Sequence, residues 1–357
     1  MKKPASTWPH HLIVFLLAGA LLSGCAAAEW QPVTLKTDDI CWPPGAECKV
    51  RYAGEIRQFE QTSQSLATLI TGKSQGGRIL KPVAIAIGPG GKMAIADQDR
   101  QGIHLYDPAD RSYRVLVMAG QEKFATPVGV AFDDAGNLYV TDSQLNKMLI
   151  YDAQANFLKA VDQADGTPLR RPTGITFNRH DKRIYLADTM QHQILVFSRL
   201  GEFIARLGTR GDQPGAFNFP THLGSDPQGN IYGTDSMNFR AQILPAGSNT
   251  WLAFGRHGNG SGDFASPKGI SADQHGIIYI AEALFDNVQI FDNSGAYLLA
   301  VGSQGSGPGQ FWMPSGLFID ENNRLYVCDT YNKRIQLFDL LTATAGETAP
   351  APGGTEK

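Results

Sequence analysis

The sequence predicts an all-β protein, a six-bladed β-propeller with four-stranded antiparallel blades. Three observations lead to this fold: a unit repeated six times, a glycine-rich composition with 39 glycines in 357 residues, and short alternating apolar segments within each unit. Such a composition suits tight turns and short strands. A four-stranded blade has two apolar faces and cannot bury them alone, so we expect the six units to pack face to face in a closed ring.

Two markers define the repeat. A proline followed two positions later by a small residue, or by His222 in the fourth unit, and then by an aliphatic residue opens each unit, at intervals of 45 to 48 residues. An acidic residue follows each proline by 15 or 16 positions, at the end of the second expected strand. The prolines are Pro82, Pro127, Pro172, Pro220, Pro267 and Pro314, and the acids are Asp97, Asp142, Asp188, Asp235, Glu282 and Asp329. A residue needed once per blade normally serves the blade itself, so we expect these carboxylates to accept backbone hydrogen bonds.

The third unit shows the four strands of one blade. Apolar segments at 174–177, 183–188, 193–197 and 202–208 are separated by turns rich in glycine, asparagine and aspartate. A glycine-rich loop carrying a phenylalanine precedes several of the prolines. We expect these aromatic side chains to fill the space between adjacent blades, because each can bury a large apolar area. They are Phe124, Phe217, Phe264 and Phe311.

Residues 1–24 have the features of an export signal. Lys2 and Lys3 precede an apolar stretch from residue 12 to 22, which is too short to cross a bilayer as a helix. The sequence LSGC at 22–25 resembles the bacterial lipobox. This resemblance implies that Cys25 is the first mature residue and carries the lipid, diacylglycerol with palmitate, and Ala26 after it favours the outer membrane. Residues 25–50 are then a lipidated linker.

The ring is expected to close at its N-terminal end. The sixth unit supplies three strands, while residues 51–59 resemble the fourth strand of the other units, so we expect this segment to complete blade six and the propeller to span residues 51–340. Cys41 and Cys48 lie just before it around a proline turn. Export places them in an oxidising compartment, which predicts a disulfide between them.

The repeats resemble NHL repeats over residues 51–339, as in PSGLFIDENNRLYVCDTYNKRIQLFD at 314–339. The triplet that names these repeats is matched best by Asn332, Lys333 and Arg334, and partly by Asn238, Phe239 and Arg240. The resemblance implies the propeller fold. It leaves the chemistry open, because the family contains binding scaffolds and a few enzymes.

Related propeller enzymes hold zinc through several inner-strand histidines, or calcium through inner-strand acids and amides. The corresponding positions here are Ala84, Gly129, Gly174, His222, Gly269 and Gly316. One histidine does not replace several, so we predict no catalytic residues, no metal and no cofactor. Two alternatives stay open: a metal-dependent lyase or hydrolase with a pore site near His222, and a sensor that binds a small ligand or sugar in the central channel.

A binding surface is predicted from the loops between second and third strands, which propeller geometry gathers on one face. The apolar residues there are Met190, Met237, Phe239, Leu284, Phe285 and Tyr331. Either they form a partner site, or each packs on the next blade. The sequence thus favours a non-catalytic docking lipoprotein of the cell envelope, a monomeric propeller that binds another envelope protein. A net charge of −3 argues against nucleic acid as a partner, and residues 341–357 are expected to be disordered.

Overall fold

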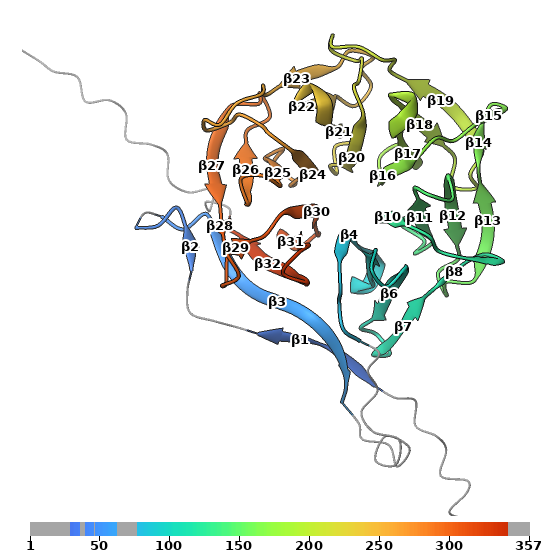
Figure 1. Ribbon diagram of the computed structural model, residues 1–357, viewed down its shortest axis with the longest axis horizontal. Helices are drawn as coiled ribbons and strands as arrows, with labels where there is room; N and C mark the ends of the chain where they lie inside the picture. Colours follow the sequence, from blue (N-terminus) through green and yellow to red (C-terminus); the bar gives the residue numbers. More distant parts are fainter. Residues whose placement is uncertain (1–28, 36–39, 46, 63–76, 342–357) are drawn as a thin grey trace, which may run out of the picture.

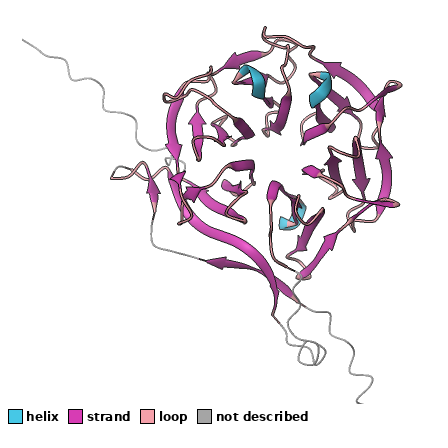
Figure 2. Cartoon of the chain, viewed as in Figure 1, coloured by secondary structure: helices cyan, strands magenta, loops and turns pink. Residues whose placement is uncertain are grey.

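The chain forms a ring of six β-sheets around a central axis (Figure 1) in the computed structural model, which describes residues 29–35, 40–45, 47–62 and 77–341. Figure 2 shows that strands make up most of the ring, with short helical turns in a few loops. The predicted all-β, six-bladed propeller is therefore confirmed. Within those residue ranges, none of the helices is long and apolar enough to cross a membrane.

Each blade runs from an inner strand at the axis to an outer strand at the rim, with neighbouring strands antiparallel. Blade one contains β4 (Pro82–Ile87), β5 (Met93–Asp97), β6 (Gly102–Asp107) and β7 (Ser112–Leu116). Blade two contains β10 (Pro127–Phe132), β11 (Leu138–Asp142), β12 (Lys147–Tyr151) and β13 (Phe157–Val161). Blade three contains β16 (Pro172–Asn178), β17 (Arg183–Asp188), β18 (Gln193–Phe197) and β19 (Phe203–Leu207).

Blade four contains β20 (Pro220–Ser225), β21 (Ile231–Asp235), β22 (Arg240–Leu244) and β23 (Leu252–Phe254). Blade five contains β24 (Pro267–Ala272), β25 (Ile278–Glu282), β26 (Asn287–Phe291) and β27 (Tyr297–Val301). Short strand pairs lie in the connecting loops: β8 (Met118–Ala119) with β9 (Glu122–Lys123), β14 (Gln163–Ala164) with β15 (Thr167–Pro168), and β28 (Ser303–Gln304) with β29 (Gln310–Phe311). Short 3₁₀ turns are η1 (Pro89–Gly91), η2 (Thr189–Gln191) and η3 (Ser236–Asn238).

Blade six is assembled from both ends of the propeller. Its strands β30 (Pro314–Ile319), β31 (Arg324–Asp329) and β32 (Arg334–Leu340) are completed by β3 (Val50–Gln61), which pairs antiparallel with β32 from Val50 opposite Leu340 to Ile56 opposite Ile335. The predicted closure by an N-terminal strand is confirmed. The observed strand is longer than the predicted segment 51–59, because it also pairs along its other edge.

That other edge is covered by β1 (Trp30–Leu35), which the sequence reasoning missed. The backbone N–H of Trp30 donates to the carbonyl of Arg111 at 2.7 Å, and its ring lies 4.9 Å from that of Tyr113 in blade one. The strand β1 therefore belongs to the sheet of blade six and also contacts blade one. It joins the first and last blades of the ring at the rim.

The predicted disulfide between Cys41 and Cys48 is present, with the two Cα atoms 5.4 Å apart. It closes a hairpin in which β2 (Cys41–Trp42) pairs with the start of β3. The ring of Trp42 lies 5.8 Å from that of Phe338, which is fully buried in blade six. The covalent link thus holds the hairpin against the strand that closes the ring.

The core consists of layers between adjacent blades. Phe264, for example, packs with Tyr232 of blade four and with Ile270 and Phe291 of blade five. The four loop phenylalanines predicted to fill these spaces are at most 2% exposed, which confirms their structural role. Full burial of such a side chain stabilises the fold by about 1.5 to 3 kcal/mol.

Candidate functional site

The recurrent acids hold the blades together from within. All six carboxylate residues are fully buried at the ends of the second strands. Asp142 accepts backbone hydrogen bonds from Ala125 at 2.8 Å and Thr126 at 3.0 Å before the inner strand, and from Leu145 at 3.0 Å in the following turn. The predicted structural role of these acids is confirmed. They accept N–H groups in the turn to the third strand and also N–H groups just before the proline of the inner strand.

The residue four positions after each acid adopts the left-handed conformation, with φ between 49° and 58°. Some of these side chains fix the start of the next blade: Asn146 accepts the N–H of Arg171 at 2.7 Å, and Asp286 accepts that of Met313 at 2.6 Å. Phe239 occupies this position in blade four. Its half-buried ring lies 4.3 Å from that of His257, so it packs within the blade edge more than it faces solvent.

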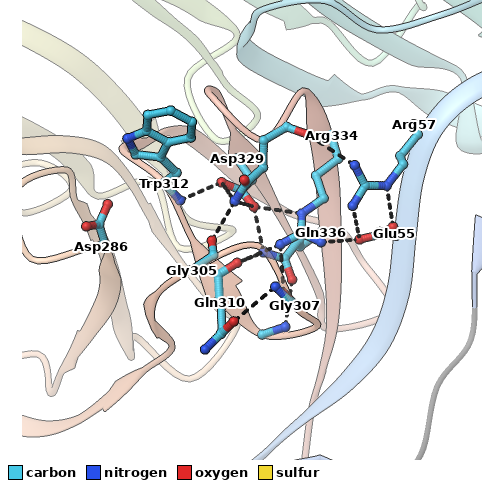
Figure 3. A network of polar contacts seen from close by, with 12 residues as sticks. Glu55, Arg57, Asp286, Gly305, Gly307, Gln310, Trp312, Asp329, Arg334 and Gln336 are labelled. Carbon is cyan, nitrogen blue, oxygen red and sulfur yellow. Dashed lines mark hydrogen bonds and ion pairs between the residues drawn. The ribbon is translucent and has the colours of Figure 1, made fainter.

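The best-matched triplet forms a polar network inside blade six (Figure 3). Arg334 is 1% exposed and donates to Asp329 at 2.7 Å and to Glu55 of the closing strand at 2.5 Å. Asn332 donates to the carbonyl of Gly305 at 2.8 Å and to Asp329. The triplet therefore binds the loop before the inner strand and the acid at the end of the second strand, which is a structural function.

The inner strands converge so closely that most of them carry glycine where they face the axis. A Cβ atom on Gly174 would lie 2.6 Å from the Cα of His222, and one on Gly316 would lie 2.5 Å from the carbonyl oxygen of Val83. A side chain at these positions therefore collides with the backbone of the next blade. The sequence reasoning treated these glycines as missing ligands, but their role is to let the blades approach one another.

The inner strands enclose a central cavity of about 870 Å³. His222 projects from β20 into its wall, at a position where the other blades carry glycine or alanine. Its Nδ1 lies 3.2 Å from the hydroxyl of Thr221. Burial, and to a smaller extent the positive charge of Lys268, lowers the pKa of His222 to about 3, so the imidazole is neutral at physiological pH.

Lys268 stands on the neighbouring inner strand, β24, one residue after Pro267. It is half-buried and makes no hydrogen bond or ion pair with any residue for which the structure gives a position. Burial lowers the pKa of its ammonium group, while the negative charge of Glu282 opposes this shift. The carboxylate of Glu282 is itself engaged, since it accepts the N–H groups of Ala265 at 3.1 Å and Ser266 at 2.7 Å.

The opposite end of the channel is crossed by an ion pair. Arg179 follows the inner strand of blade three, and Glu321 follows that of blade six, which lies across the ring. Both residues line the cavity, and both side chains are exposed. An exposed ion pair contributes little to stability. Its position nevertheless distinguishes this end of the channel from the end where the inner strands begin and Lys268 lies.

Five exposed side chains form what we call the apolar arc: Met190, Met237, Leu284, Trp312 and Tyr331. Four of them come from the turns between second and third strands of blades three to six, as the sequence predicted. Their exposed fractions lie between 45% and 60%. Phe285, also predicted, is half-buried beside Leu284.

Trp312 was not predicted as part of this surface. Its ring lies 5.4 Å from that of Tyr331, and its carbonyl accepts the N–H of Tyr331 at 3.3 Å. The sequence GQFWMP did carry a signal, because two aromatic residues stand side by side before the proline. Phe311 fills the space between blades, and the adjacent position therefore points outward.

Cys25 and the export signal lie outside the described residues. Cys328 is fully buried, and burial raises the pKa of its thiol well above the usual value, so it stays protonated. Across the described ranges of the chain, no group of three or more histidine, cysteine, aspartate or glutamate side chains is arranged to hold a metal ion.

Comparison with known proteins supports the fold. A family model described as a 6-bladed beta-propeller matches residues 165–239 and 272–349, less than half of the chain. A comparison with curated protein sequences gives no significant match.

Among solved structures, the chain is similar to a gluconolactonase from Xanthomonas campestris, at 15% identity and a TM-score of 0.58, covering 74% of this chain and 87% of that one. It is similar to an auxiliary nutrient binding protein from Bacteroides thetaiotaomicron, at 14% identity and a TM-score of 0.57, covering 73% and 69%. It also resembles virginiamycin B lyase from Staphylococcus aureus, at 14% identity and a TM-score of 0.53, covering 73% and 95%. At these identities the likeness establishes the fold alone: the chain is a six-bladed β-propeller.

Proposed function

We propose that this protein is an NHL-repeat docking lipoprotein of the bacterial cell envelope, which binds another envelope protein through the apolar arc. The lipid on Cys25 anchors it in the outer membrane, and the propeller itself catalyses no reaction. In this proposal the propeller is a rigid monomeric platform whose partner is a protein.

The observation that carries the proposal is the apolar arc. Five large side chains lie at least 45% exposed on turns and loops of four adjacent blades. Single exposed apolar residues are ordinary, whereas a set gathered on one face is typical of an interaction site. Methionine, tryptophan and tyrosine are also residue types that are enriched in the buried centres of protein interfaces.

Two further observations favour binding over catalysis. The channel wall presents two histidines, His180 and His222, and neither belongs to a grouping suited to a metal within the described ranges. The buried polar groups of blade six, such as Arg334 and Asp329, are engaged in holding the fold together. One of the similar structures is described as a nutrient binding protein, and others as a lyase and a gluconolactonase, so the fold itself is compatible with either class.

Site-specific photo-crosslinking in the native membranes tests the proposal. A photoreactive amino acid replaces Tyr331, and adducts are compared between the otherwise unchanged protein and a Met237→Ser, Leu284→Ser variant. The matched control is Leu200→Ser, which removes an apolar side chain that is 70% exposed in a turn between third and fourth strands. We expect the double variant to lose the adducts and the control to keep them, with circular dichroism showing that both are folded. Equal adducts in all three proteins contradict the proposal.

A further inference from the structure

The apolar arc lies beside a charged group whose partner is not supplied by the fold. The hydroxyl of Ser236, the residue before Met237, lies 2.6 Å from that of Thr221 and donates to the carbonyl of Pro267 at 3.4 Å. Pro267 immediately precedes Lys268. Met237 therefore lies on the turn that contacts the start of the strand bearing Lys268.

Leu284 flanks the same group from the next blade. Its backbone N–H donates to the carboxylate of Glu282 at 3.1 Å, and Glu282 is the acid that acts electrostatically on Lys268. Met237 and Leu284 thus lie on the turns of two adjacent blades, four and five, at the channel end where the strand of Lys268 begins.

Lys268 itself is poorly compensated. The residue is half-buried, and its ammonium group, which keeps contact with solvent, has no hydrogen bond or ion pair among the described residues. The neighbouring imidazole of His222 is neutral and offers no negative charge. Glu282 is the acid that acts on it, but no ion pair within 4.0 Å forms between them. An ammonium group with no ion-pair partner in its own chain is available to pair with a negative charge on a bound segment, and such charge complementarity orients a partner.

From this arrangement we infer that the apolar arc binds a protein segment that carries a carboxylate, either a chain end or an acidic side chain, flanked by apolar residues, and that this carboxylate pairs with Lys268. The inference rests on the proposed function and specifies the chemistry of the partner. The occupant is a protein segment and not a small molecule, because the exposed side chains of the arc come from turns and loops of four adjacent blades. Charge complementarity fixes the register, and the apolar contacts supply the affinity.

Zero-length carbodiimide coupling on the native membranes tests the inference. The reagent activates a partner carboxylate as an O-acylisourea. The unprotonated amine of Lys268 attacks the carbonyl carbon of this ester and forms an amide. The amine proton passes to the isourea, which leaves as the substituted urea. We expect mass spectrometry of tryptic fragments to show Lys268 joined to an aspartate, a glutamate or a C-terminal residue of another protein. The Lys268→Arg variant keeps the charge but cannot form this product, so the linked fragment disappears while photo-adducts at Tyr331 remain.

The Lys268→Met variant completes the test. We expect it to fold, with an unchanged thermal unfolding profile or a higher midpoint, and to reduce the photo-adducts at Tyr331 about tenfold. If Lys268 couples only to Glu282 within the chain, or to a small carboxylic acid, and Lys268→Met keeps its photo-adducts, the inference is overturned while the proposed function stands. If adducts at Tyr331 are absent, or persist in the Met237→Ser, Leu284→Ser variant, the proposed function fails and the inference fails with it.

Discussion

Arg334 and Glu55, which are 279 positions apart in the chain, form a buried ion pair of 2.5 Å across the ring closure. Arg334 is 1% exposed and Glu55 is 4% exposed, and Arg334 also pairs with Asp329 (Figure 3). The pair joins β32 to the N-terminal strand β3 by a charged contact that only the closed ring provides.

Replacing Glu55 with glutamine should lower the free energy of unfolding by about 3 to 5 kcal/mol, because Arg334 stays buried with less negative charge around it. Urea unfolding followed by tryptophan fluorescence measures the change. Glu60→Gln, which alters an exposed carboxylate on the same strand, serves as the control and should change stability by about 0.5 kcal/mol or less. Equal effects of the two substitutions would show that the buried pair adds nothing to closure.

Removing the Cys41 to Cys48 disulfide by the double substitution to serine should lower the free energy of unfolding by about 2 to 3 kcal/mol, as expected for a loop with a sequence separation of 7 residues. Differential scanning calorimetry measures the loss. Reducing agent should destabilise the unsubstituted protein by the same amount and leave the double variant unchanged. An unaltered midpoint after verified reduction would contradict this prediction.

Gly174→Ala should destabilise the ring by about 1 to 3 kcal/mol, because the new Cβ would lie 2.6 Å from the Cα of His222 and 2.7 Å from the carbonyl oxygen of Thr221. The control is the reverse change in blade one, Ala84→Gly, where a Cβ is already accommodated; it should cost about 1 kcal/mol or less. Chemical unfolding compares the two. A neutral Gly174→Ala variant would mean that the inner strands separate easily.

His222 should make stability depend on pH. Its pKa is about 3 in the folded protein and near 6.5 in the unfolded chain, so the unfolded state binds the extra proton between these values. The free energy of unfolding therefore rises as pH increases from 3 to 6.5, by at most about 1.4 kcal/mol per pH unit, and the full contribution is present above pH 6.5.

His222→Gln should remove this contribution, so that the difference in stability between the two proteins shrinks as pH falls from 6.5 to 4. Urea unfolding at several pH values provides the measurement, and all other titrating groups, including Lys268, are common to both proteins. A difference that stays constant with pH would place the folded pKa of His222 close to its unfolded value.

Much of the fold could be predicted because its signals recur in every unit. The prolines, the buried acids and the loop phenylalanines each mark the same place in successive blades, and the unpaired third strand of the last unit indicated where the N-terminal segment must lie. The interpretation of the inner-strand glycines was incomplete for a physical reason. A sequence shows that Gly174 lacks a side chain, but the closeness of the next backbone appears only when the ring is closed.

The features that sequence reasoning missed occur once in the molecule. The contact of Trp30 with Tyr113, the pairing of Arg334 with Glu55, and the position of Lys268 beside His222 each join segments with no counterpart in other units. The apolar arc was foreseen in blades three to six, since it follows the register of the acids. Trp312 was missed because it lies in a connecting loop directly after Phe311, and the loop was interpreted as a structural one on account of that phenylalanine.

The added strand β1 also determines how the molecule carries a mechanical load. Tension applied at the N-terminal end reaches β1 first, then the crosslinked hairpin around Cys41, and only afterwards the ladder between β3 and β32. The pairs between β1 and β3 therefore bear this tension first, and the start of β3 is pulled directly only after these pairs have separated. A pull from the N-terminal side therefore detaches β1 before it peels the start of β3 away from β32.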